Sequence, residues 1–127
     1  MVTLFAYHTY RNPFNEMDPE KLAQLCLQAL EDEIAFQGAN TIAAMIMEPI
    51  LGAGGVIPPH HSFAPAVQEI CNRNGILLIT DEVITAYGRT GAWSGARLWG
   101  IQPDMMRPPK PSLTATSLLG LSCLGNG

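Results

Sequence analysis

The feature that most constrains the fold of this chain is a run of four apolar residues at positions 76–79, followed by Thr80 and then by two acids. Asn74 and Gly75 precede the run, so it starts at a turn. Such a run is typical of a short strand that is buried on both faces of a parallel sheet. Asp81 follows the strand, and ligands of open α/β sheets bind at the carboxyl ends of strands. We therefore interpret Asp81 as a ligand-facing acid and not as the cap of a following helix.

The segments before this strand predict a parallel βαβ unit. An apolar strand over residues 41–47 ends at Glu48, because the next residue is a proline and cannot donate to a β ladder. A Gly/Pro-rich loop and a helix over residues 62–74 then lead to the strand at 76–80. Such a unit is right-handed, and its strands end at the same edge of the sheet. If the two strands are neighbours, Glu48 and Asp81 lie on one side of the sheet.

Two further segments complete the predicted organisation. Asp18 as N-cap, a proline at the first helical position and apolar residues at helical spacing predict a helix that ends at Gly38. A short helix over residues 92–99 leads to a third strand at 105–106. The prolines at 108, 109 and 111 exclude a buried central strand beyond that point. We therefore predict a folded unit over residues 1–106 and a divergent, disordered tail over 107–127.

Composition excludes several classes of function. The net charge of −4 and the absence of a basic cluster argue against nucleic-acid binding. Only 14% of the 127 residues are charged, which is low for a free-standing domain and suggests surface that faces another part of a protein.

The three cysteines lack a CxxC spacing, so reduced thiols and a cytoplasmic location are expected. No apolar run is long enough to span a membrane and no secretory signal is recognisable. His60 and His61 lack a third ligand nearby, so no metal site is predicted.

Several segments, in order and at the expected spacing, resemble the class III aminotransferases of the ornithine/ω-amino acid type, which use pyridoxal 5′-phosphate (PLP). The matching segments are MEPILGAGGVIPP (47–59), EICNRNG (69–75), ILLITDEVITAYGRTG (76–91) and WGIQPDMM (99–106). YRNPF (10–14) resembles the ω-amino acid:pyruvate branch. The resemblance covers residues 9–106. It implies an α/β fold with a partial, mainly parallel sheet, as a fragment of the large domain of fold type I (aspartate aminotransferase-like) transferases.

The resemblance also implies roles for individual residues. Asp81 matches the acid that pairs with the pyridine nitrogen of PLP, which keeps the ring protonated and able to accept electrons. Val83 matches a residue that packs against the ring, and Glu48 matches an acid near the cofactor. Lys110 is in register with the lysine that forms the Schiff base with PLP. A structural ion pair remains the alternative for Glu48, and an ordinary solvated lysine remains the alternative for Lys110. The role of Arg89, in the GRTG segment, is left open.

The implied activity is the transfer of an amino group between an amine or amino acid and a keto acid, in a homodimer with small-molecule substrates and no membrane partner. Family chains are several times longer and supply a phosphate-binding turn that is not recognisable here. The alternative is therefore a truncated, non-catalytic remnant or interaction fragment that does not bind PLP stably, and the chain alone is expected to be inactive. A metal hydrolase that uses Glu48 and Asp81 would leave the GRTG segment unexplained. We interpret the sequence from Arg107 onward as the product of a shifted reading frame or altered splicing.

Overall fold

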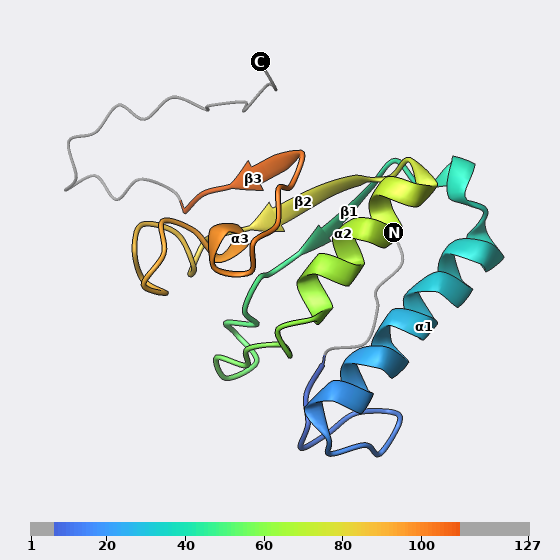
Figure 1. Ribbon diagram of the computed structural model, residues 1–127, viewed down its shortest axis with the longest axis horizontal. Helices are drawn as coiled ribbons and strands as arrows, with labels where there is room; N and C mark the ends of the chain where they lie inside the picture. Colours follow the sequence, from blue (N-terminus) through green and yellow to red (C-terminus); the bar gives the residue numbers. More distant parts are fainter. Residues whose placement is uncertain (1–6, 110–127) are drawn as a thin grey trace.

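The computed structural model describes residues 7–109. In chain order the elements are helix α1 (Pro19–Gln37), the 3-10 helix η1 (Ala39–Thr41), strand β1 (Ala44–Met47), helix α2 (Phe63–Asn74), strand β2 (Leu77–Asp81), helix α3 (Gly95–Leu98) and strand β3 (Met105–Arg107). The three strands form one parallel sheet with β2 in the centre. Figure 1 shows the strands side by side, with α2 along the sheet and α1 beside α2. The predicted α/β class with a parallel sheet is confirmed.

Helix α1 begins and ends where the sequence predicts. The Asp18 Oδ1 accepts hydrogen bonds from the backbone N–H groups of Glu20 and Lys21, both at 3.0 Å. At the other end Gly38 takes a φ of 83°, and its N–H donates to the carbonyl of Ile34. The buried side of the helix carries Leu22, Ala23, Cys26, Leu30 and Ile34. These residues belong to the same hydrophobic core as β1, α2 and β2.

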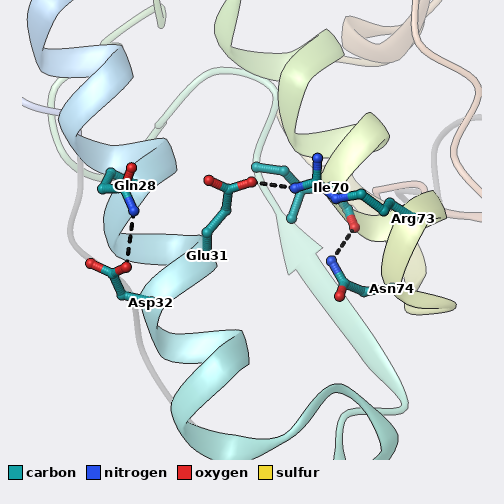
Figure 2. A network of polar contacts seen from close by, with 6 residues as sticks. All are labelled: Gln28, Glu31, Asp32, Ile70, Arg73 and Asn74. Atoms are coloured by element: carbon teal, nitrogen blue, oxygen red, sulfur yellow. Dashed lines mark hydrogen bonds and ion pairs between the residues drawn. The ribbon is translucent and has the colours of Figure 1, made fainter.

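One ion pair joins α1 to α2, and the other polar contacts beside it each lie within a single helix (Figure 2). Arg73 near the end of α2 forms an ion pair with Glu31 of α1, and both side chains are largely exposed. The neighbouring Asn74 donates from its amide to the carbonyl of Ile70 at 2.8 Å, which satisfies a carbonyl in the last turn of α2. Because exposed ion pairs stabilise by only about 0–1 kcal/mol, the apolar core holds the two helices together and the pair adds little.

The βαβ unit is confirmed, with differences at the ends of its elements. Residues 38–41 turn instead of entering a strand, because the Thr41 hydroxyl donates to the carbonyls of Gln37 and Gly38. Strand β1 therefore starts at Ala44, three residues later than predicted. The predicted helix over 92–99 is reduced to the four residues of α3. The third strand is one residue longer than predicted and includes Arg107, so the sheet extends past the predicted boundary at residue 106.

Asp104 sets the start of β3. Its Oδ2 accepts a hydrogen bond from the Leu78 N–H at 2.8 Å, and its own N–H donates to the Leu78 carbonyl at 2.9 Å. Asp104 thus pairs with β2 one residue before β3 begins. This contact fixes the parallel register in which Ile79 lies opposite Met105 and Asp81 opposite Arg107.

The prediction that the central strand is buried on both faces is wrong for the part of the chain that the structure describes. Leu78 and Thr80 are fully buried on the face that α2 covers. The other face exposes 47% of Leu77, and it exposes Ile46 and Met105 to a similar degree. We call this surface the open face; it comprises Ala44, Ile46, Leu77, Ile79 and Met105. It is open because the long helices belong to one core on the opposite side.

Two of the three cysteines lie within the described residues. Cys26 and Cys71 are both free and buried. Burial raises the pKa of both thiols, and it raises that of Cys71 to about 11, with a smaller contribution from the negative charge of Asp104. These thiols are therefore protonated at neutral pH and serve as apolar core groups. Within residues 7–109, no helix combines the length and the hydropathy required to cross a bilayer.

The cap of α1 predicts a pH-dependent effect on stability. The backbone N–H of Lys21, and less strongly that of Glu20, holds the pKa of Asp18 below its usual value. Because the pKa is lower in the folded chain, the stabilisation is present above the unfolded-state pKa and is lost as the pH falls through the folded-state pKa. Asp18→Ala should therefore lower the melting temperature at neutral pH, and the difference from wild type should shrink in acid. Circular dichroism melts over a pH series measure this difference.

The matched control for this prediction is Asp32→Ala, because Asp32 lies inside α1 and, among residues 7–109, its side chain accepts only from Gln28. This variant should melt close to wild type at neutral pH. Equal melting temperatures for Asp18→Ala and Asp32→Ala at neutral pH would contradict the capping role.

Candidate functional site

The strand ends bring three charged residues to one edge of the sheet. Met47 lies opposite Thr80, so Glu48 leaves β1 at the level where β2 reaches Asp81. Asp81 in turn lies opposite Arg107 at the end of β3. The predicted placement of Glu48 and Asp81 on the same side of the sheet follows from this parallel register. Arg107, which the sequence assigned to the tail, joins them there.

Both carboxylate oxygens of Asp81 are engaged. Oδ1 accepts a hydrogen bond from the Val83 N–H at 3.2 Å, which shapes the turn after β2. Oδ2 accepts from Nη1 of Arg107 at 2.5 Å, in an ion pair whose side chains are 19% and 57% exposed. Asp81 thus shapes a local turn through one oxygen. Through the other oxygen it presents its charge to a cation from the next strand. A cationic group at the strand edge is what this carboxylate can bind.

The turn after β2 also exposes an apolar side chain beside this acid. Val83 lies two residues after Asp81 and is 41% exposed. The side chain of its neighbour Glu82 points into the protein and is fully buried, so the Val83 side chain points outward. An exposed β-branched side chain next to a carboxylate offers a flat apolar contact and a charge at short range.

Glu48 organises the loop that follows β1. Its Oε2 accepts a hydrogen bond from the Gly52 N–H at 2.8 Å. The Glu48 carbonyl accepts from the Tyr7 hydroxyl at 3.2 Å, and the Trp99 Nε1 donates to the Pro49 carbonyl at 2.8 Å. Burial, and next the charge of Glu48, raises the pKa of Tyr7, so its hydroxyl stays protonated and donates. Within the described residues, Glu48 therefore has a structural role through hydrogen bonds, and the ion pair considered as its alternative is not formed.

Two glycines allow the loops at this edge to pack closely. A Cβ on Gly52 would collide with the side chain of Ile84, in the turn after β2. A Cβ on Gly95 would lie 2.5 Å from Cβ of Pro49. The loop after β1 therefore packs against both the turn after β2 and the start of α3. The loop itself was predicted from its glycines and prolines, whereas Gly95 gave no signal in the sequence.

Glu82 is the residue that sequence reasoning missed. It is fully buried, and its carboxylate accepts hydrogen bonds from the hydroxyl of Thr85 and the N–H groups of Gly95 and Ala96. The adjacent acids at 81 and 82 are therefore in different environments. The only signal in the sequence was that neighbouring residues at a strand end point to opposite sides.

One predicted site residue has no described position, and others are placed elsewhere on the chain. Lys110 lies outside the described residues. Arg89 is exposed in the turn between β2 and α3. The rings of His60 and His61 are in tilted contact with their centroids 4.1 Å apart, and His60 is hydrogen-bonded to Ser62. Among residues 7–109, no group of three acidic, histidine or cysteine side chains is placed to hold a metal ion.

Comparison with known proteins gives consistent matches. The family model of class-III aminotransferases matches residues 1–114. The hypotaurine/taurine–pyruvate aminotransferase of Paracoccus denitrificans is 37% identical over 108 residues, which are 85% of this chain and 23% of that protein. The putrescine–pyruvate aminotransferase of Pseudomonas aeruginosa is 43% identical over 91 residues, 72% of this chain and 20% of that protein.

Solved structures agree with these matches. The crystal structure of an amine transaminase from an uncultivated Pseudomonas species, in its PLP-bound form, superposes with a TM-score of 0.75 and 51% identity. The match covers 77% of this chain and 22% of the amine transaminase chain. An (S)-enantioselective ω-transaminase from Thermomicrobium roseum has a TM-score of 0.77 and 42% identity, over 83% of this chain and 23% of its own. The chain thus spans roughly a fifth of the length of these relatives.

The close packing of Gly95 predicts a cost for any side chain there. Gly95→Ala should destabilise the fold by about 1–3 kcal/mol, because the added methyl overlaps Pro49 and must displace a buried ring. The free energy of unfolding in urea, followed by circular dichroism, measures this cost.

Gly54→Ala is the matched control, since a Cβ at residue 54 meets only ordinary contacts with Ile57 and Leu51. It should leave stability unchanged or raise it by about 0.4–1 kcal/mol through the unfolded state. Equal free energies for the two variants would contradict the packing described here.

Proposed function

The chain belongs to the class-III aminotransferases, and on this premise we propose that residues 9–106 carry the ring-binding edge of a PLP site. The proposed reaction moves an amino group between an amine or amino acid and a keto acid. PLP is the cofactor of this family. The observation that supports the proposal is the position of the Asp81 carboxylate, at the edge where β1, β2 and β3 all end.

The residues at this edge fit the ring end of PLP in their chemistry. The Asp81 carboxylate already binds one cationic group, so it can pair equally with a protonated pyridine nitrogen. Val83 exposes an apolar side chain beside it, which can lie against the face of a ring. Arg107 is a competitor for the same oxygen. The Arg107 side chain is 57% exposed, so its guanidinium can turn into water, and it must leave before a ring nitrogen can pair with Asp81.

Each residue then has a distinct task. PLP, when bound, supplies an electron sink for the charge released as a substrate loses its α-proton. Asp81 holds the proton on the ring nitrogen that this requires. Glu48, whose Oε2 is held by Gly52, presents Oε1 to a cationic group of a neighbouring residue or substrate. Lys110 is proposed as the lysine that holds PLP covalently and moves the substrate proton.

A second candidate is a chain that does not hold PLP by itself. Three observations support it: Arg107 already pairs with Asp81, one face of the sheet is open, and the chain spans roughly a fifth of its relatives. Binding energy must exceed the entropy lost on association and on ordering of loops. One ring contact and one packing residue do not supply that much. We propose that PLP binding and catalysis need further parts of a class-III enzyme.

The remaining expectations are part of the same proposal. We propose small-molecule amine or amino acid and keto acid substrates, with neither nucleic acid nor membrane as a partner. The net charge of −4 supports the first exclusion. A cytoplasmic location is proposed from the cysteine pattern, and a homodimer is proposed from the family resemblance.

A chimera tests the catalytic proposal. Residues 9–106 would replace the matching segment of the Pseudomonas aeruginosa relative, whose remaining sequence supplies the other parts of the enzyme. The chimera should show PLP absorbance and transamination. Asp81→Ala in the chimera should lower kcat about 100-fold or more, because a charge that stabilises the reacting ring is lost. Steady-state kinetics measure the effect.

Asp32→Ala in the same chimera is the control, because Asp32 lies on the exposed side of α1. It should keep the kcat of the parent chimera. Full activity of the Asp81→Ala chimera would rule out the role proposed for the ring-nitrogen acid.

The chain without other parts tests the second candidate. When it is mixed with PLP and reduced with borohydride, mass spectrometry should find no more pyridoxyl on Lys110 than on Lys21, the other lysine of the sequence. Lys21 lies in α1 and reports non-specific modification. A stoichiometric and selective adduct on Lys110 would show that the chain binds PLP unaided.

A further inference from the structure

Glu82 is an acidic residue that the proposed chemistry does not use. Its side chain is fully buried, and an ionised carboxylate without partners in that environment is very costly. It lies between Asp81 and Val83, the two residues proposed to bind the ring. A buried acid at this point of the sequence needs an explanation other than contact with a substrate.

The carboxylate of Glu82 accepts three hydrogen bonds. Oε2 accepts from the Thr85 hydroxyl and from the Gly95 N–H, the latter at 2.7 Å. Oε1 accepts from the Ala96 N–H at 2.8 Å. The Thr85 bond closes the turn after β2, and the other two attach that turn to the start of α3. Charge-assisted bonds in a buried site are among the stronger ones in a protein.

The backbone of the same residue makes further connections. The Glu82 N–H donates to the carbonyl of Arg107 at 2.8 Å, which links it to the end of β3. Its carbonyl accepts from the N–H groups of Thr85 and Ala86 at 3.2 and 3.1 Å. Glu82 therefore joins the ends of two strands, one turn and one helix start.

The start of α3 extends this connection to the loop after β1. Gly95 packs directly against Pro49, the residue that follows Glu48. The Trp99 indole, at the end of α3, donates to the Pro49 carbonyl. A shift of α3 thus moves the backbone beside Glu48 as well as the turn beside Asp81.

We infer that Glu82 is a positioning residue whose buried carboxylate fixes the turn on which Asp81 and Val83 are presented. The inference rests on the proposed function, since that function gives Asp81 and Val83 their roles. The two adjacent acids then have different roles: Asp81 faces the edge of the sheet, where the ring would bind, and Glu82 faces inward and holds the turn. Only a carboxylate suits the inner position, because an amide at residue 82 would place its NH2 group against the N–H of Gly95 or of Ala96.

Two buried threonines provide a matched pair of variants. Thr85→Val removes one donor to Glu82 and keeps the size of the side chain. Thr80→Val is the control, because the Thr80 Oγ1 is equally buried and has no hydrogen-bond partner in the described structure. In the whole chain, Thr85→Val should speed amide exchange of residues 82–87 and 94–98 about tenfold or more, and Thr80→Val should not. Exchange in α1 should stay the same in both.

A second measurement separates positioning from general stability. The 13C signal of the Asp81 carboxyl should shift in Thr85→Val and in Glu82→Gln, and it should return to the wild-type position in Thr85→Ser, which restores the hydroxyl. A residue that only stabilises the fold would leave this signal unchanged in the folded molecules. An unchanged signal in both Thr85→Val and Glu82→Gln, with wild-type amide exchange, would overturn the inference.

In the chimera, the kcat and KM of the same threonine variants report on the positioning role. Thr85→Val should lower kcat about tenfold with little change in KM, Thr85→Ser should restore it, and Thr80→Val should have no effect. If Asp81→Ala lowers kcat as proposed, equal kcat values for Thr85→Val and Thr80→Val would overturn the positioning role. If Asp81→Ala stays fully active while the Asp81 carboxyl signal moves in Thr85→Val, the proposed function fails and the positioning role stands.

Discussion

Parallel pairing of β2 with both of its neighbours is the constraint on which the rest of this structure depends. A parallel partner requires the chain to return to the edge where it started, and α2 provides that return between β1 and β2. All three strands therefore end at one edge. Glu48, Asp81 and Arg107 are far apart in the sequence and meet there for this reason alone. The candidate site is a product of topology more than of any single motif.

Beyond the strand ends, polar contacts and close backbone packing hold the edge together. The loop after β1 is held through the carbonyls of Glu48 and Pro49, which accept from Tyr7 and Trp99. The turn after β2 is held through the carboxylate of Glu82. Such bonds are directional, so they specify where the backbone lies more closely than apolar burial does. An edge built in this way can present charged side chains at defined positions.

Local signals in the sequence predicted the elements well. The cap at Asp18 and the stop at Gly38 act within one helical turn, so the bounds of α1 could be predicted from neighbouring residues. The order strand, helix, strand was likewise predictable from the Gly and Pro residues that separate the elements. The segment 41–43 was assigned wrongly because a threonine hydroxyl bonded back to the end of α1.

Long-range features could not be predicted in this way. Which face of the sheet the helices cover depends on how α1 and α2 pack, and period-2 alternation is the same for either choice. The pairing of Asp81 with Arg107 joins residues 26 apart in sequence and exists only once β3 is in register. The family resemblance supplied roles for Asp81, Val83 and Glu48, but it gave no indication of the burial of Glu82.

The open face ties the stability of this chain to its surroundings. Ile46, Leu77 and Met105 keep about half of their side-chain surface in water, on a pleated layer whose type is normally covered on both sides. Any molecule that buries this surface in the folded state and ignores the unfolded chain adds its binding free energy to folding by mass action. The apparent melting temperature of this protein therefore depends on which molecules that bind the open face are present, and on their concentration.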